Sequence, residues 1–177
     1  MGVEWVGGDT LVPATVSLGG VVVSSVVSAN GSEIVVVAGA SLTGGVGDIS
    51  VVAASGALMT AAGAWTYVPP AVVVSVSPQS GQIGTRVTIT GMGLRCGGAA
   101  VVSVLFGADE AASIMSETDS SVVAVAPLVP GSSAVKNITL VADTQAFVVA
   151  EDAWVSLVTG AVSSVSPTSG QTSTVVS

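Results

Sequence analysis

The sequence has 177 residues and a formal net charge of −8, from three basic and eleven acidic residues. This balance argues against a nucleic-acid ligand, because phosphates need a basic footprint, and against binding to an anionic membrane surface. The mean hydropathy of +0.86 would suit a membrane protein, but the longest apolar runs, such as residues 35–40, are much shorter than the ~20 residues of a membrane span, so we expect no membrane insertion by this segment.

The first part of the chain, residues 1–70, has the composition of short β-strands. Runs of Val, Ile and Thr are separated by Gly, Pro, Asn and Ser, and no stretch keeps a helical period for long. The pattern predicts strands near 14–18, 21–27, 33–38, 48–53 and 63–68.

Residues 71–160 show the same character with a clearer alternation. Within 86–90, Val87 and Ile89 fall on one face of an extended chain and Thr88 and Thr90 on the other, which is typical of a half-buried strand. The pattern predicts further strands at 71–76, 100–106, 121–126, 136–142 and 145–150.

An internal repeat organises these strands into domains. Residues 75–85 (SVSPQSGQIGT) return at 164–174 as SVSPTSGQTST, and both Pro78/Pro167 and Trp65/Trp154 are 89 residues apart. We therefore expect an all-β chain of tandem immunoglobulin-like β-sandwiches with a repeat of about 89 residues. Its domains would be a sandwich lacking its opening strands, a complete sandwich, and the opening strands of a further repeat, at residues 1–70, 71–160 and 161–177.

The sequence around the repeat resembles a known family. Residues 75–81 and 84–94 (GTRVTITGMGL) resemble the opening of an IPT/TIG domain, an immunoglobulin-like sandwich found in plexins and transcription factors. Residues 64–70 (AWTYVPP) are similar to the family's aromatic closing strand, whereas the second unit departs from it after Trp154. The resemblance implies modules like those of cell-surface receptors, in which loops at one end of the sandwich contact a partner.

Two glycosylation triplets and a single cysteine bear on whether the protein lies inside or outside the cell. The sequence has only two Asn, and both lie in acceptor triplets, at Asn30 and Asn137. They predict an extracellular or cell-surface glycoprotein, with covalent glycans supplying the solubility that charge does not. Cys96 has no partner in the sequence; it is interpreted as a small buried side chain, with an intermolecular disulfide as the alternative.

The residues needed for catalysis are scarce. Histidine is absent, which removes the commonest general base and metal ligand, and we expect no catalytic residue, no cofactor and no metal. The acidic clusters Asp109–Glu110, Glu117/Asp119 and Glu151–Asp152 could serve a glycosidase or a calcium site, but they have the spacing of solvated loop charges.

These observations favour a non-enzymatic structural protein, a segment of a rod or filament. Its partners would be adjoining repeats or other copies of the chain, joined head to tail. One mode of joining is strand addition, in which a donor segment including Val165, Pro167, Val175 and Val176 completes the first unit of the next copy; the other is a chain that continues into further repeats. The alternative function is a ligand-binding or adhesive ectodomain module of a receptor or adhesin.

Overall fold

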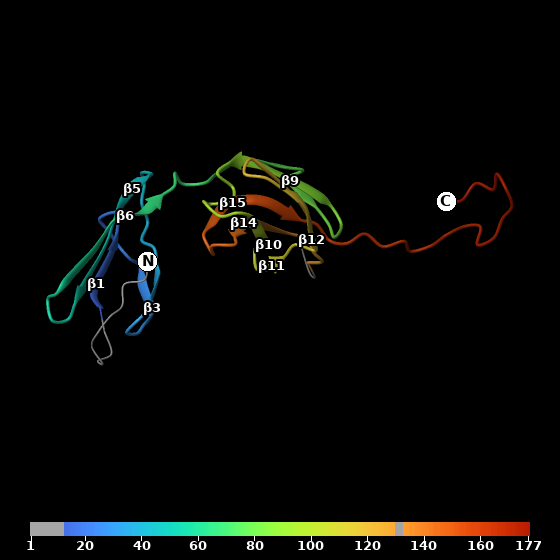
Figure 1. The fold of residues 1–177 in the computed structure, drawn as a ribbon. Helices are drawn as coiled ribbons and strands as arrows, with labels where there is room; N and C mark the ends of the chain where they lie inside the picture. The colour runs from blue at the N-terminus through green and yellow to red at the C-terminus, as the bar shows by residue number, and fades with distance from the viewer. Residues whose placement is uncertain (1–12, 130–132) are drawn as a thin grey trace. The chain divides into compact units, whose positions relative to one another are not determined.

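The computed structural model describes residues 13–129 and 133–177 and divides the chain into two compact units, Met1–Ala71 and Val72–Ser177 (Figure 1). The described residues form strands, turns and coil only. They include no helix with the length and hydropathy that crossing a membrane would require.

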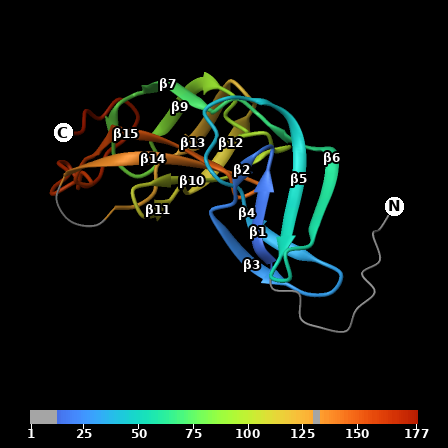
Figure 2. The same ribbon diagram turned by 90° about the vertical axis from the view of Figure 1, so that its left-hand side faces the viewer.

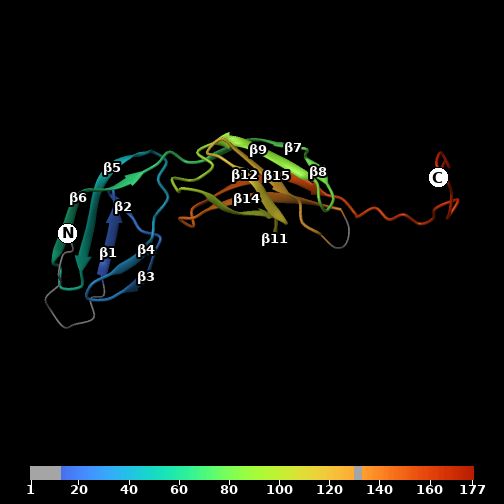
Figure 3. The same ribbon diagram turned by 45° about the vertical axis from the view of Figure 1, so that its right-hand side comes forward.

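The second unit is a sandwich of two sheets, seen from different sides in Figures 2 and 3. All strand pairs are antiparallel except β15 with β8. One sheet has the order β12 (Ser113–Glu117), β13 (Ser121–Val125), β9 (Arg86–Met92), β7 (Val72–Ser77). The other has the order β11 (Asp109–Glu110), β10 (Val101–Phe106), β14 (Ala134–Ala142), β15 (Phe147–Ser156), β8 (Ser80–Gly81).

The core of this unit lies between the two sheets. Trp154 is 1% exposed and meets Phe106 edge to face, with ring centroids 5.3 Å apart. Val87 and Ile89 are fully buried, as the alternation in β9 predicts. The other buried apolar residues are Val76, Leu94, Val101, Val104, Val122, Ala124, Ala126, Ile138, Leu140, Ala142 and Val148.

The first unit has two smaller sheets. One has the order β2 (Val21–Val22), β1 (Pro13–Leu18), β5 (Gly45–Ala53), β6 (Leu58–Tyr67), and the other pairs β3 (Ser25–Ala29) with β4 (Ile34–Val37). Its buried apolar residues among those described are Val16, Leu18 and Ala53. Among the described residues, the first unit therefore buries far fewer apolar side chains than the second.

The two units share their strand registers. The β5–β6 hairpin pairs residue for residue as β14–β15 does, at an offset of 89, and both have a bulge at the same place. The pairing of β1 with β5 repeats that of β10 with β14, and the pairing of β3 with β4 repeats that of β12 with β13. In these pairs β1, β3 and β4 lie 88 residues before their counterparts, whereas β5 keeps the offset of 89. The one-residue difference falls in the loop before β5, where length changes cost little.

The predicted strands are confirmed in position, with corrections at their ends. The predicted strand 21–27 is wrong as a single element, because β2 pairs with β1 while β3 pairs with β4 in the other sheet. The strand β12 was not predicted, and β6 and β15 are longer than expected, at ten residues each. These differences arise from the availability of a partner strand, which local sequence does not encode.

Residues 157–177 form turns and coil without a strand, and all are exposed. Even so, the turn inside this segment has the conformation of the turn that opens the second unit. Gln171 N–H donates to Thr174 Oγ1 at 2.8 Å, as Gln82 N–H does to Thr85 Oγ1 at 3.1 Å. Ser166 and Ser177 exchange two backbone hydrogen bonds of 3.0 Å, at the positions of the Ser77 and Thr88 partners of β7 and β9.

Candidate functional site

The first unit carries two sheet edges that are covered in the second unit. In the second unit, β13 is flanked by β9 and then β7, and β15 is flanked by β8. Among the described residues of the first unit, β4 pairs only with β3, and β6 pairs only with β5. These two edges, called here the open face, present backbone donors and acceptors of the kind that accept an added strand.

The apolar side chains on the open face are less buried than their counterparts. Ile34 and Val36 are half-buried, whereas the equivalent Val122 and Ala124 in β13 are fully buried. On the outer side of β4, Val35 and Val37 are 39% and 49% exposed. The open face thus has the inward apolar side chains of a sandwich, but no described strand lies beside β4 to cover them.

The two tryptophans that mark the repeat lie in different surroundings. Trp154 is a core residue of the second unit. Trp65, at the same register position, is partly exposed and packs edge to face on Tyr67, with centroids 5.5 Å apart. Its Nε1–H is shielded from solvent and has no hydrogen-bond partner among the described residues, which is an unfavourable state for a buried donor.

The predicted donor segment, residues 161–177, carries exposed apolar side chains. Val165 and Val176 stand 89 residues after Val76 and Val87, which are 7% and 0% exposed in the core of the second unit, but they are 49% and 57% exposed themselves. Val175 is 86% exposed and stands at the position of Arg86, an outward residue of β9. Pro167 is exposed at the start of the turn, as Pro78 is.

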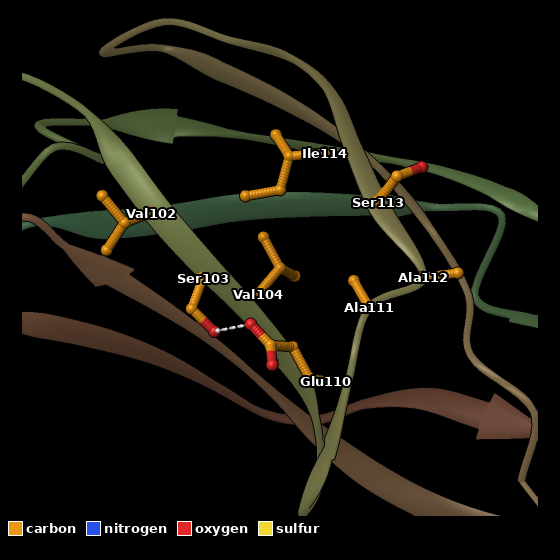
Figure 4. A pocket seen from close by; sticks show the side chains of 8 residues that line it. All are labelled: Val102, Ser103, Val104, Glu110, Ala111, Ala112, Ser113 and Ile114. Atoms are coloured by element: carbon orange, nitrogen blue, oxygen red, sulfur yellow. Dashed lines mark hydrogen bonds between the residues drawn. The ribbon is translucent and has the colours of Figure 1, made fainter.

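A groove of about 440 Å³ lies beside the segment that crosses from β11 to β12, between the edges of the two sheets of the second unit. Figure 4 shows the Ser103 hydroxyl bonded to Glu110 on one side of it, with Ser113 and Ile114 on another. Glu110 is the single carboxylate among its lining residues, whereas glycoside hydrolysis needs two across a cleft. The lining therefore lacks the carboxylate pair of a glycoside hydrolase.

The acidic clusters take part in the architecture. Glu117 accepts from Arg95 Nε and Nη2, at 3.0 and 2.9 Å, and from Val101 N–H at 3.2 Å. Through these bonds Arg95 lowers the pKa of Glu117, and Val101 N–H lowers it further. Asp109 pairs with Lys136 at 2.6 Å. Within residues 13–129 and 133–177, no three His, Cys, Asp or Glu residues gather as a metal site would require.

Cys96 lies in the turn between β9 and β10, in a left-handed conformation with φ of 49°. It is half-buried and its thiol is free. Burial raises the pKa of this thiol, and the neighbouring Asp119 carboxylate raises it further. Both effects favour the protonated thiol, which is the less reactive form.

The two candidate glycosylation sites differ in their surroundings. Asn30 is exposed in the β3–β4 turn, where its Oδ1 accepts from Ser32 and Glu33 N–H at 2.9 Å each. Asn137 is half-buried beside the β14 bulge, and its Oδ1 accepts from Asp152 N–H at 2.9 Å. In the first unit Asp48 makes the same bond to Gly63 N–H, so the bulge accounts for an Asn or Asp here.

Sequence reasoning did not single out the open edge of β4. Residues 34–37 were predicted as part of an ordinary strand. Their counterparts 122–125, at an offset of 88, have β9 beside them, whereas residues 34–37 have no such strand among the described residues. The donor segment stays a prediction.

Comparison with known proteins supports the fold. Residues 71–152 match the family model of the IPT/TIG domain. Among solved structures, the Plexin A4 full extracellular region (domains 1 to 10) has 18% identity and a TM-score of 0.50 over 88% of this chain and 13% of that one. At this identity the likeness concerns the fold alone. A comparison with curated protein sequences finds no match.

Two bacterial proteins show weaker structural likeness. They are SGBP-B of the Bacteroides ovatus mixed-linkage glucan utilization locus, in complex with a heptasaccharide, and the surface glycan-binding protein PbSGBP-B of Prevotella bryantii. Each has 16% identity, with TM-scores of 0.37 and 0.38 over 83% and 78% of this chain. The chain spans 38% and 32% of their lengths.

Proposed function

We propose that this chain, whose residues 71–152 are an IPT/TIG domain, is a non-enzymatic segment of an extracellular, glycosylated rod or filament built from tandem immunoglobulin-like repeats. The observation that carries the proposal is the recurrence of one structural plan along the chain. The β5–β6 and β14–β15 hairpins share one register at an offset of 89, and the turn at 166–177 repeats the turn at 77–88 at the same offset.

The short joints between repeats support a linear array. Tyr67, the end of β6, is five residues before Val72, the start of β7. Ser156, the end of β15, is also five residues before Ala161, which opens the next repeat by sequence. Short connections limit the freedom of successive units, which a linear array of repeats requires.

The surface supports an extracellular, glycosylated setting. Only 8% of the residues are charged, against about 25% in a typical soluble domain. Many large apolar side chains are exposed, including Leu42 at 92% and Val46 at 71%. Glycans at Asn30, neighbouring repeats, or both would cover such a surface and limit aggregation.

The absence of histidine and the structural use of Glu117 and Asp109 support a non-catalytic role. A ligand-binding or adhesive ectodomain is the second candidate function. The observation in its favour is the groove lined by Ser103 and Glu110. Its test is a binding screen in which Glu110→Ala abolishes a saturable signal that the native chain gives.

Electron microscopy of the native material tests the rod. Ten-residue strands rising about 3.4 Å per residue make each unit roughly 35 Å long, so we expect thin fibres with an axial spacing near that value or a multiple of it. Glycosidase treatment should reduce the mass of the dissociated chain. Dispersed particles of one or two units, without fibres, would contradict the proposal and favour the ectodomain.

A further inference from the structure

We propose that Asn137 carries an N-linked glycan and that this glycan covers the outer face of the sheet formed by β10, β14 and β15. The inference rests on the extracellular, glycosylated setting of the proposed function. It adds to that function one attachment atom and the surface that the attached sugar serves. Every residue that it uses to define this surface lies in the second unit.

The Asn137 side chain is held at its oxygen and free at its nitrogen. Its Oδ1 accepts from Asp152 N–H at 2.9 Å, which orients the amide. In residues 13–129 and 133–177, Trp65 Nε1 is the single side-chain polar atom of a buried or half-buried residue that is both shielded from solvent and unpartnered. Asn137 Nδ2 also has no partner among these residues, so it lies open to solvent. This nitrogen is the atom to which a sugar is attached.

The fold uses only the oxygen of this amide. At the same place in the first unit, Asp48 Oδ1 accepts from Gly63 N–H at 2.8 Å, and a carboxylate has no N–H to offer. An Asp at position 137 would therefore meet the needs of the bulge. The Nδ2 group is additional, and it occurs together with Thr139, the third residue of the acceptor triplet.

Asn137 lies on the outer face of its sheet. Ile138 is fully buried between the sheets, and successive residues of a strand point to opposite faces, so Asn137 and Thr139 point outward. The strand β14 lies between β10 and β15 in the sheet order. A sugar on Asn137 would thus emerge from the middle of this face and not from its edge.

The outer face is apolar around the attachment point, although the outer face of an antiparallel sheet is commonly polar. The cross-strand partners of Thr139 are Leu105 on β10 and Val149 on β15. In the next row Val141 is opposite Phe147, which is 66% exposed. None of these residues is charged. A glycan would place the C–H faces of its sugar rings against these side chains and its hydroxyl groups toward water.

The first unit differs from the second in both features at once. Asp48, which cannot carry an N-linked sugar, takes the place of Asn137. The row of outward residues that corresponds to the Thr139 row carries hydroxyl groups in the first unit, and it consists of Ser17, Ser50 and Thr60. The face without an acceptor Asn is therefore solvated by its own side chains, whereas the face with one is apolar. This joint change supports the glycan as the cover of the second face.

The attachment step needs an activated sugar as its co-reactant. Asn137 Nδ2 would attack the anomeric carbon of an oligosaccharyl diphosphate and form the C–N bond. The C–O bond to the diphosphate breaks, the diphosphate leaves with the electron pair, and Nδ2 loses one proton to a base of the transferring enzyme. Because β14 is paired on both sides in the folded unit, the step would precede the pairing of this strand.

Mass spectrometry of peptides from the native material locates the sugar. We expect a glycan on Asn137 that Thr139→Ala abolishes and that Thr139→Ser, which preserves the acceptor triplet, retains. A bare Asn137 would overturn the inference. If Asn30 is glycosylated in that case, the glycosylated setting of the proposed function stands; if neither residue carries a sugar, that setting fails as well.

Fluorescence of a dye that binds exposed apolar surface tests the cover itself. We expect the Thr139→Ala chain to bind more dye than the Thr139→Ser chain, because its outer face has lost the glycan. Adding Leu105→Ser and Val149→Thr, which copy the row of the first unit, should remove the excess. Enzymatic deglycosylation of the native chain makes the same comparison without a substitution. Dye binding that does not rise in either comparison would show that the sugar leaves this face uncovered, and would refute the inference.

Discussion

At the scale of single residues, the few charged side chains of the second unit make hydrogen bonds that fix its loops. Arg95 N–H donates to Asp119 Oδ1 at 3.1 Å, while its guanidinium binds Glu117. Ala99 N–H donates to Asp143 at 3.1 Å. With eleven acidic residues and three basic ones, each such carboxylate serves backbone donors that would otherwise be unpaired.

Glu117 gives a test of this role through pH. Because Arg95 lowers the pKa of Glu117 in the folded state, the carboxylate stabilises the fold at pH values above its unfolded pKa of about 4.3. That stabilisation is lost as the pH falls through the lowered folded pKa. We expect Glu117→Gln to lower the urea midpoint of unfolding near neutral pH. The midpoint of this variant should also fall less than that of the native chain as the pH is lowered into the acid range. Glu151→Gln, an exposed residue of β15, is the control, and identical acid profiles for Glu117→Gln and the native chain would contradict this role.

Asn137 gives a second residue-scale prediction. Its Oδ1 accepts from Asp152 N–H, the bond that Asp48 makes in the first unit. We expect Asn137→Asp to keep the stability of the second unit and Asn137→Ala to lose about 1 kcal/mol, as for one intramolecular hydrogen bond. Urea unfolding followed by circular dichroism measures both. Equal losses for the two variants would show that the acceptor oxygen is not what this position requires.

At the scale of elements, equivalent strands have unequal surroundings. The strands β6 and β15 share length and register, but Trp65 on the first is partly exposed and Trp154 on the second is buried. The difference follows from the neighbouring strands, because β15 has β8 beside it and β6 has no described equivalent.

The two tryptophans should therefore differ in their contribution to stability. We expect Trp154→Ala to cost about 3–5 kcal/mol, as for a large side chain removed from a packed core, and Trp65→Ala to cost clearly less in the dissociated chain. The measurement is urea unfolding of both variants and of the native chain. A Trp65→Ala cost that equals that of Trp154→Ala in the dissociated chain would contradict an open first unit.

The sequence was sufficient to predict the strands with clear alternation and the repeat that relates them. The 86–90 alternation placed Val87 and Ile89 in the core, and the 89-residue spacing placed Trp154 at the position of Trp65. It did not predict β12, whose hydrogen bonds come from β13, or the open edge of β4. Both depend on which strand lies alongside, which is a property of the fold and not of a local segment.

At the scale of the whole molecule, the open face and residues 161–177 both carry exposed apolar residues. In the proposed rod, contacts with neighbouring repeats would bury these residues, which lowers the aggregation risk of each.

Hydrogen–deuterium exchange of the isolated chain and of the native fibre tests the proposed rod most directly. In a rod a neighbouring repeat covers the open face, so the amides of Thr66 and Val68 should exchange fast in the isolated chain and slowly in the fibre. Amides in β14 should be protected in both. Exchange at Thr66 and Val68 that is equally fast in both, while β14 remains protected, would contradict a rod of contacting repeats.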